Sequence, residues 1–326
     1  MTLHTIDLTT ENIDEIEKKC HSETEFEYLV TSHQLEVREH VAKNPNLPTK
    51  FATWMAEDVH VRVRESLATN PNISENVILI LANDKKISVR CAIAKHSNLS
   101  SKYMERFSKD ESYLLRDAAA LNPSISQELL KNLSEDTEWG VRRSIASNSK
   151  ATTEILSTLS IDTATEVVDA VSKNHCTSPE ILNRLLETSE NPQNNRYRSA
   201  ILMNPSLPES KAIEIYVNAL SPVAKEHDEQ DDDEDAELIE TSDDRISVAQ
   251  RPNLSDDFIE KIVVDPYSIV RSYLARNECV TDKFLSQLAL DSDESVRTDV
   301  YKNPNSSTET KASAVLLGLD EGVGND

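Results

Sequence analysis

Apolar residues along this chain alternate between two helical patterns. One pattern places apolar side chains four residues apart, as in Ile73, Val77 and Leu81, and predicts a short helix with one buried stripe. The other places them one residue before, and three and four residues after, an arginine such as Arg38. Neither stripe can be buried within a single short helix. The patterns therefore predict pairs of amphipathic helices that pack against neighbouring pairs.

The two patterns repeat every 26 residues, which is the step from Arg38 to Arg64. Strings such as VREHVAKNPNLP and VRESLATNPNIS can be laid over one another, and self-similarity of this kind predicts a repeat architecture. We call the arginine position of each string the anchor. The ten anchors are Arg38, Arg64, Arg90, Arg116, Arg142, Val168, Arg198, Arg245, Arg271 and Arg297. Two steps are longer than the period, the one that ends at Arg198 and the one that ends at Arg245.

Two polar columns keep the same register. Asparagine stands six residues after the anchor, at Asn44, Asn70, Asn122, Asn148, Asn174, Asn204, Asn277 and Asn303, and is replaced by His96 and Arg251. Aspartate stands six residues before it, at Asp58, Asp84, Asp110, Asp136, Asp162, Asp265 and Asp291. A proline often follows the asparagine, and an Asn-Pro step ends a helix because proline cannot continue the backbone hydrogen bonds. The aspartate is expected to end the first helix of each pair and to cap the second.

These patterns predict an all-α fold, a right-handed α-solenoid superhelix of about ten 26-residue two-helix repeats. Residues 1–36 are expected to form an N-terminal cap and residues 37–305 the solenoid. An acidic loop is expected to interrupt the solenoid at about 222–244, and residues 306–326 to form a C-terminal capping helix that frays from Gly318.

The string VRxxxAxNPxL resembles the leucine-rich repeat variant family, and the six-residue spacing from Asp to Arg resembles HEAT repeats. The resemblance covers about residues 32–310. It implies an α-solenoid, and it favours a binding scaffold because both families are mostly scaffolds with a few enzymes among them. One protein type with variant repeats carries an iron–sulfur cluster on N-terminal cysteines. Here only Cys20 lies in that region, so the cluster is not expected.

Charge narrows the choice of partner. The chain has 58 acidic and 34 basic residues, a net charge of −24, which disfavours attraction to nucleic acid or anionic lipid and favours partners with basic surfaces. Twelve of the acidic residues lie between Glu226 and Asp244, where there is no basic residue. Such a run is expected to be a mobile loop that solvates the protein or docks a basic partner. A calcium site there is less favoured, because the run lacks the glycine and spacing of a calcium loop.

Composition excludes other classes. Only Gly140 precedes Gly318, so no glycine-rich phosphate loop can form in the body of the chain. No apolar stretch reaches the roughly 18 residues of a membrane span, and the start of the chain is acidic rather than basic and then apolar, so a cytoplasmic protein is expected. The cysteines are Cys20, Cys91, Cys176 and Cys279, too widely spaced for a disulfide framework or a metal motif. No cofactor is expected. Cys91 is the strongest candidate for a reactive thiol among the four, although an unreactive cysteine is favoured there as well.

The arginine column first suggests an anion-binding ladder. Helical geometry places each anchor inside the apolar arc of its helix, however, so we expect buried arginines paired with the aspartate column. Phosphate binding by the column remains the alternative.

Opposite the apolar arc lie the positions two before and one, two and five after each anchor, which are expected to line a concave face. They hold eight acidic and eight basic residues, whereas a nucleic-acid groove would be basic. Apolar residues occur there in two runs, which indicate either a partner contact or ordinary scatter and contacts to loops. The runs are Cys91, Ala92, Leu114, Ala118 and Leu121, then Ala200, Met203, Ile246, Ile269 and Tyr273.

We therefore expect a non-enzymatic protein-binding scaffold or adaptor that holds a partner on its concave face or beside its acidic loop. The expected contact residues are Met203, Ile246, Ile269, Tyr273, Arg276, Leu114 and Leu121. The alternative is a nucleic-acid-processing enzyme of the HEAT-like DNA glycosylase type. Asp117, Asp169 and Tyr273 would be the pieces of its site, while no histidine of the chain belongs to an HxxxH or HExxH motif.

Overall fold

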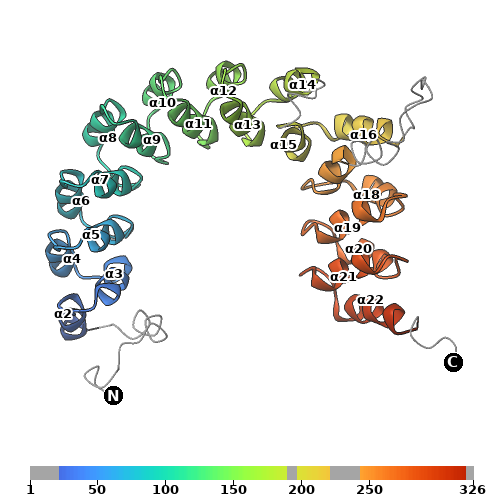
Figure 1. Cartoon of the computed structure of the whole chain (residues 1–326), viewed down its shortest axis with the longest axis horizontal. Coiled ribbons are helices and arrows are strands. Elements are labelled where there is room, and N and C mark those ends of the chain that lie inside the picture. The colour runs from blue at the N-terminus through green and yellow to red at the C-terminus, as the bar shows by residue number, and fades with distance from the viewer. Residues whose placement is uncertain (1–21, 189–196, 221–242, 321–326) are drawn as a thin grey trace, which may run out of the picture. The chain divides into compact units, whose positions relative to one another are not determined.

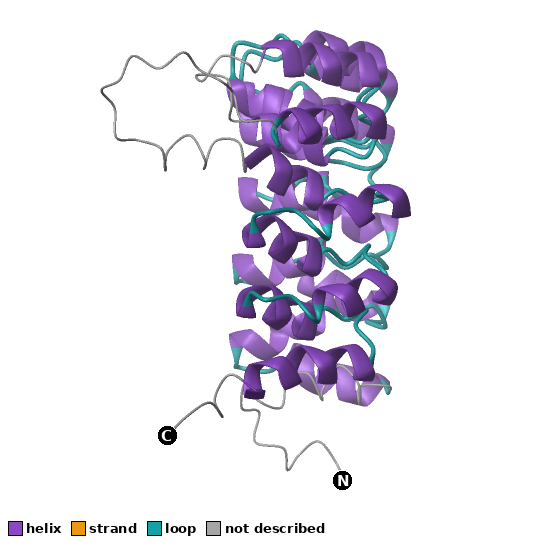
Figure 2. Cartoon of the chain, turned by 90° about the vertical axis from the view of Figure 1, so that its right-hand side faces the viewer, coloured by secondary structure: helices purple, strands orange, loops and turns teal. Residues whose placement is uncertain are grey.

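A computed structural model describes residues 22–188, 197–220 and 243–320, with side chains to residue 316. Helices joined by short turns make up these ranges, and no strand occurs in them (Figures 1 and 2). The chain divides into two compact units, Met1–Ile155 and Leu156–Asp326. The all-helical solenoid predicted from the sequence is confirmed, while its right-handed superhelix and the total of ten repeats stay predictions.

The first unit alternates first and second helices of each pair. The first helices are α2 (Glu23–Val30), α4 (Thr49–Met55), α6 (Glu75–Ala82), α8 (Ser101–Ser108) and α10 (Gln127–Leu133). The second helices are α3 (Leu35–Lys43), α5 (Val61–Ala68), α7 (Ile87–Ala94), α9 (Tyr113–Ala120) and α11 (Trp139–Ser147). Within this unit the second helices lie on the inner side of the curve that the repeats follow (Figure 1). The helix α12 (Thr153–Leu159) crosses the boundary between the units.

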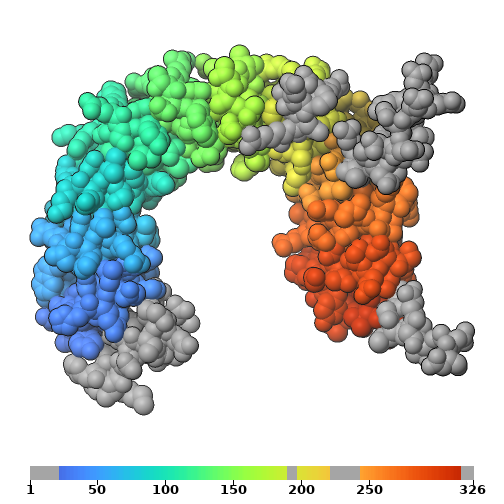
Figure 3. Space-filling model, in the orientation of Figure 1, coloured from blue at the N-terminus to red at the C-terminus, as the bar shows by residue number. Residues whose placement is uncertain are grey.

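The second unit continues the alternation. Its helices are α13 (Thr165–Lys173), α14 (Pro179–Thr188), α15 (Arg198–Met203), α16 (Glu209–Asn218), a segment at 243–249, α18 (Asp256–Ile262), α19 (Ser268–Arg276), α20 (Asp282–Leu288), α21 (Glu294–Lys302) and α22 (Thr308–Asp320). In each unit the side chains fill the space between successive repeats (Figure 3).

The core follows the predicted apolar stripes. Ile73, Val77 and Leu81 of the first-helix pattern are buried, as are Val37 and Val41 of the second-helix pattern. Each helix has only seven to ten residues in most repeats, too short to be stable alone. Burial of both stripes between neighbouring repeats therefore supplies the stabilisation.

The asparagine column joins each repeat to the one before it. The buried amide of Asn122 donates from Nδ2 to the backbone oxygens of Ala94 and His96, at 2.6 and 3.0 Å, and its Oδ1 accepts from the N–H of Ser124 at 2.7 Å. Equivalent bonds from Nδ2 to two carbonyls of the preceding repeat are made by Asn70, Asn148, Asn204, Asn277 and Asn303. The column thus pairs backbone groups that the helix ends leave without partners.

The two residues that interrupt this column also bond to backbone carbonyls of the preceding repeat. His96 places Nε2 3.0 Å from the backbone oxygen of Asn70, and its Nδ1 accepts from the N–H of Asn98. Arg251 is buried and donates to the carbonyls of three residues, Leu202, Asn204 and Leu207. Burial lowers the pKa of its guanidinium.

The arginine column pairs with the aspartate column, as the helical geometry predicted. Arg64 donates through Nη1 to the backbone oxygen of Asp58 in its own repeat, at 2.6 Å. Its Nε and Nη2 donate to the carboxylate of Asp84 in the next repeat, at 2.6 and 3.2 Å. The same pairing from one repeat to the next joins Arg38 to Asp58, Arg116 to Asp136, Arg245 to Asp265 and Arg271 to Asp291. The arginines therefore hold successive repeats together.

The aspartates also start the second helices, although not as N-caps. The Asp84 carboxylate accepts the N–H of Lys86 at 2.8 Å, and Lys86 is the residue in the N-cap position of α7. The N-cap position of α7 therefore lies two residues after the aspartate that was predicted to occupy it. A side chain that accepts from the backbone two residues later forms an Asx turn, which directs the chain into the helix.

The structure adds detail at the longest break in the period, before Arg245, and at the C-terminal end of the chain. The acidic loop was expected to extend to Asp244, but residues 243–249 are helical, and the rest of that expected loop lies outside the described residues. Asp244 replaces the missing column aspartate, because its carboxylate accepts from Nε and Nη2 of Arg198, each at 2.8 Å. The helix α22 continues past Gly318 to Asp320, and the frayed tail expected from Gly318 stays a prediction.

Stability is expected to fall at acidic pH because of the aspartate column. Burial raises the pKa values of Asp84, Asp136 and Asp291, but hydrogen bonds from arginine and from the backbone outweigh it and lower them below the ordinary 3.8. A lowered folded pKa contributes stability that is complete above the unfolded pKa and is lost as pH falls through the folded pKa. We expect melting temperatures to fall steeply below about pH 4.

The control is the variant Asp136→Asn, which cannot titrate at this position. Its melting temperature should fall less than that of the wild type between about pH 5 and about pH 3. Parallel curves for the two proteins would contradict the assignment.

Candidate functional site

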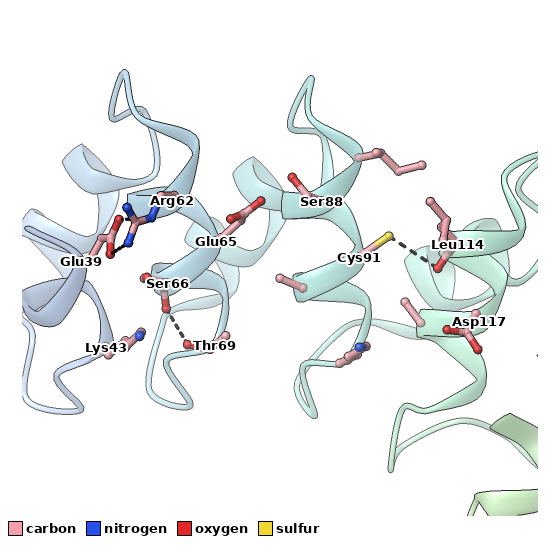
Figure 4. Close-up of a pocket in the computed structure, with 14 residues that line it drawn as sticks. Glu39, Lys43, Arg62, Glu65, Ser66, Thr69, Ser88, Cys91, Leu114 and Asp117 are labelled. Carbon is pink, nitrogen blue, oxygen red and sulfur yellow. Dashed lines mark hydrogen bonds and ion pairs between the residues drawn. The ribbon is translucent and has the colours of Figure 1, made fainter. Parts of the chain in front are cut away.

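A groove lies across the second helices of the first unit. It has a volume of about 660 Å³ and is lined by residues of α3, α5, α7 and α9 and of the turns that follow or precede them (Figure 4). Because these helices belong to four successive repeats, equivalent positions follow one another along the groove. Helices packed at about 8 to 10 Å would make it roughly 30 Å long, a shape suited to a polymer segment.

The part of the groove over α7 and α9 holds its apolar side chains, beside Ser88, Lys95 and Asp117. Ile87, Cys91 and Ala92 line it from α7, and Leu114 and Ala118 from α9. Leu114 is 44% exposed, so a large aliphatic side chain there faces solvent. An exposed aliphatic side chain beside an open groove gives an incoming side chain apolar surface to cover.

The charges of the groove lie in two columns. Acidic residues occupy the position one after the anchor, at Glu39, Glu65 and Asp117, and lysines occupy the position five after it, at Lys43 and Lys95. With Arg62 the lining holds three acidic and three basic side chains, so it lacks the positive charge that a nucleic-acid groove needs.

Two carboxylates of this lining already have partners. Oε1 of Glu39 lies 2.7 Å from Nε of Arg62, and Oε2 accepts from Nη2 of Arg62 at 2.9 Å (Figure 4). Asp117 accepts from Oγ of Ser144 at 2.5 Å. Glu65 is half-buried, and its carboxylate has no hydrogen bond or ion pair with any residue that the structure describes.

Three residues predicted on the exposed face are buried instead. Glu39 is covered by its ion pair with Arg62 from the next repeat, and Asp299 accepts from Arg276 and Ser272 of the preceding repeat. Ala118 is also buried. Neighbouring second helices pack closely enough to cover the positions one and two after the anchor, which a single helix would leave in solvent.

Cys91 does not have the environment of a reactive thiol. Its Sγ donates to the backbone oxygen of Leu114 at 3.5 Å, and burial raises the pKa of the thiol (Figure 4). A raised pKa reduces the thiolate that reacts with electrophiles, in agreement with the unreactive cysteine that the sequence favoured. Cys176 and Cys279 are exposed, while Cys20 lies outside the described residues.

The predicted contact residues lie in both units. Leu114 lines the groove, and Leu121 is exposed at the C-terminal end of α9 but is not part of the lining. In the second unit Met203 and Ile269 are exposed, while Ile246 is half-buried in the helical segment at 243–249. That segment packs beside α15, since its Ser247 bonds to Ser199 at 2.9 Å.

Tyr273 and Arg276 belong to a polar cluster on α19. The Arg276 guanidinium lies 5.1 Å from the centre of the Tyr273 ring, and its Nε lies 2.8 Å from the Asp299 carboxylate. Tyr273 is therefore half-covered by its own neighbour, and Arg276 is already paired. A partner that used this cluster would have to share these contacts.

Glu65, Arg62, Ser88 and Ile87 were not among the contact residues predicted from the sequence. They carry no shared apolar or metal-binding pattern that would single them out. Their common signal is position, because each lies one after, two before or three before an anchor.

Other kinds of site find no support in the part of the chain described here. No group of three or more His, Cys, Asp or Glu side chains there could hold a metal ion. None of the helices described combines the length and apolar character needed to cross a membrane. Asp117, the aspartate weighed for a glycosylase, lies in a lining without surplus positive charge.

Comparison with known proteins identifies no relative of this chain. No model of a known protein family matches the chain, and no curated protein matches it in sequence.

Proposed function

We propose that this protein is a non-enzymatic scaffold that binds a segment of a partner protein on the face formed by its second helices. The observation that carries the proposal is the groove across α3, α5, α7 and α9, which is open, elongated and apolar at one end. Exposed apolar surface rimmed by charged groups is typical of protein-interaction sites.

The partner is expected to have a basic surface. The chain carries 24 more acidic than basic residues, which steers basic partners towards it. The acidic run from Glu226 to Asp244 supplies half of this excess, and we propose that it accelerates encounter. The spacing of the cysteines supports a reducing compartment such as the cytoplasm.

The repeat type is part of the same proposal. The VRxxxAxNPxL strings support kinship with leucine-rich repeat variants, whose members are mostly binding scaffolds. No observation in the structure favours the DNA glycosylase alternative.

Leu114→Arg is expected to weaken partner binding by about 2 kcal/mol or more, or roughly thirtyfold, because it places a charge on the apolar end of the groove. Affinity capture from the native cell should return proteins that the variant loses, and titration calorimetry with the purified partner then measures the change. The matched control is Leu290→Arg, since Leu290 is also exposed but follows α20 in the second unit.

Two further variants locate the contact. Met203→Ala with Tyr273→Ala tests the second apolar run. Deletion of residues 226–242, which keeps Asp244 as the partner of Arg198, tests the acidic segment through the association rate and its salt dependence. Binding that survives Leu114→Arg but fails in the double variant would move the site to the second unit. Binding that survives every variant would refute a site on the second helices.

A further inference from the structure

Four side chains of the groove lining follow an anchor by one residue. The first, Glu39 of α3, is paired with Arg62, and the other three are Glu65, Cys91 and Asp117 on α5, α7 and α9. Figure 4 shows Glu65 reaching towards the space between α5 and α7, with Cys91 next along the groove and Asp117 beyond it. Beyond the paired Glu39, the column therefore reads acidic, neutral, acidic.

The two carboxylates of this column lack cations. Among the described residues no lysine, arginine or histidine nitrogen lies within 4.0 Å of the Glu65 or Asp117 carboxylate, whereas Glu39 in the same column is closed by Arg62. Half-buried carboxylates without a counter-ion lose hydration and gain no ion pair. A partner with cationic side chains at Glu65 and Asp117 supplies the counter-ions that these two carboxylates lack within the groove.

The spacing of the column matches an α-helix. Equivalent positions on neighbouring second helices are separated by one packing distance, about 8 to 10 Å. Seven residues of an α-helix rise about 10.5 Å, so side chains seven apart on one face meet successive repeats. Glu65 and Asp117 are two repeats apart and would meet side chains fourteen residues apart, with the seventh residue between them over Cys91.

The apolar end of the groove favours a helix over an extended chain. Ile87, Ala92, Leu114 and Ala118 offer no side-chain hydrogen-bonding group there. An extended segment would leave backbone N–H and C=O groups unpaired against this surface, whereas a helix pairs its own backbone.

We propose that the groove binds an amphipathic α-helix that carries two cationic side chains fourteen residues apart and an apolar side chain midway between them. The cations pair with Glu65 and Asp117, and the apolar face covers Cys91, Ala92 and Leu114. This inference rests on the proposed function and specifies the chemistry of the partner at the same groove.

The test uses the full chain and a labelled synthetic peptide of about 21 residues, which as a helix spans roughly 30 Å. The peptide carries lysines fourteen residues apart, a leucine midway and further leucines on the same face. A second peptide replaces both lysines by glutamate, and a third places proline at the centre. Fluorescence anisotropy measures binding, which is expected for the lysine peptide and much weaker for the other two.

Glu65→Gln and Asp117→Asn should each weaken binding of the lysine peptide by about fivefold, the size of a partly exposed ion pair. Combining Glu65→Lys with Asp117→Lys should reverse the preference, so that the glutamate peptide binds better than the lysine peptide. The matched control is Glu75→Lys, because Glu75 is exposed on α6 and lies outside the groove lining. Circular dichroism verifies that each variant remains folded.

Each outcome decides the proposal. Equal binding of the lysine peptide to the wild type and to the double lysine variant would overturn it, and equal binding of the proline peptide would replace the helix by an extended chain. If the peptide fails to bind while Leu114→Arg still abolishes capture of a cellular partner, the occupant is wrong and the proposed function stands. If the peptide does not bind and Leu114→Arg does not reduce capture of a partner, both the helical occupant and the proposed function are wrong.

Discussion

Asp84→Ala is expected to destabilise the first unit by about 3 to 5 kcal/mol, because it leaves a buried arginine without its partner. Arg64 and Asp84 have side chains only 5% and 8% exposed, and the carboxylate accepts from Nε of Arg64 at 2.6 Å. The same carboxylate accepts the N–H of Lys86 at the start of α7. One substitution therefore removes a link between repeats and a helix-starting turn.

Urea denaturation and hydrogen exchange across α5 and α7 measure this change, since repeat arrays can unfold in parts and a single transition is not assured. The matched control is Glu105→Ala, which removes the exposed pair between Glu105 and Lys109 and should change stability far less, because water screens the pair. Similar losses for the two variants would show that the column aspartates do not hold the repeats together.

Asn122→Leu is expected to cost about 3 kcal/mol or more. The Asn122 side chain is fully buried and pairs two carbonyls of the preceding repeat and one N–H of its own. Leucine keeps the branching of asparagine but is larger, and it leaves these three backbone groups unpaired, at about 1 to 3 kcal/mol for each buried group. The free energy of unfolding from urea denaturation checks the value.

The chain itself suggests the controls. Asn132→Leu alters an exposed asparagine of α10 and should change stability by about 0.5 kcal/mol or less. Asn122→His should be tolerated better than Asn122→Leu, because His96 already pairs one carbonyl of the preceding repeat and one N–H of its own at the equivalent position. A histidine variant as unstable as the leucine variant would show that geometry, and not bonding capacity, decides this position.

The candidate groove was predicted only in part. Leu114, Cys91, Ala92 and Ala118 were expected on an exposed face, and all four line the groove. Glu65 was noted there only as one of eight acidic residues. Whether a carboxylate has a counter-ion depends on side chains of the next repeat, and a single-helix pattern does not contain that information.

The sequence by itself determined the helix pairs, their order and the partners of the arginine column. Apolar residues at helical spacing decide which face is buried, and Asn-Pro and Asp steps decide where helices end, because these effects act within a few residues. The fixed period of the anchors then brings equivalent residues onto neighbouring helices, so pairing of the arginine and aspartate columns follows from spacing. The structure decides that the carboxylate bound by Arg64 is Asp84 of the next repeat and not Asp58 of its own.

Only the tertiary structure decided how the irregular positions are used. It buried Glu39 and Asp299, paired Arg198 with Asp244 across the longest break in the period, and directed Arg251 to three carbonyls. These outcomes depend on the distance and rotation between successive helix pairs. Such quantities arise from the packing of whole repeats, and no local pattern along the chain encodes them.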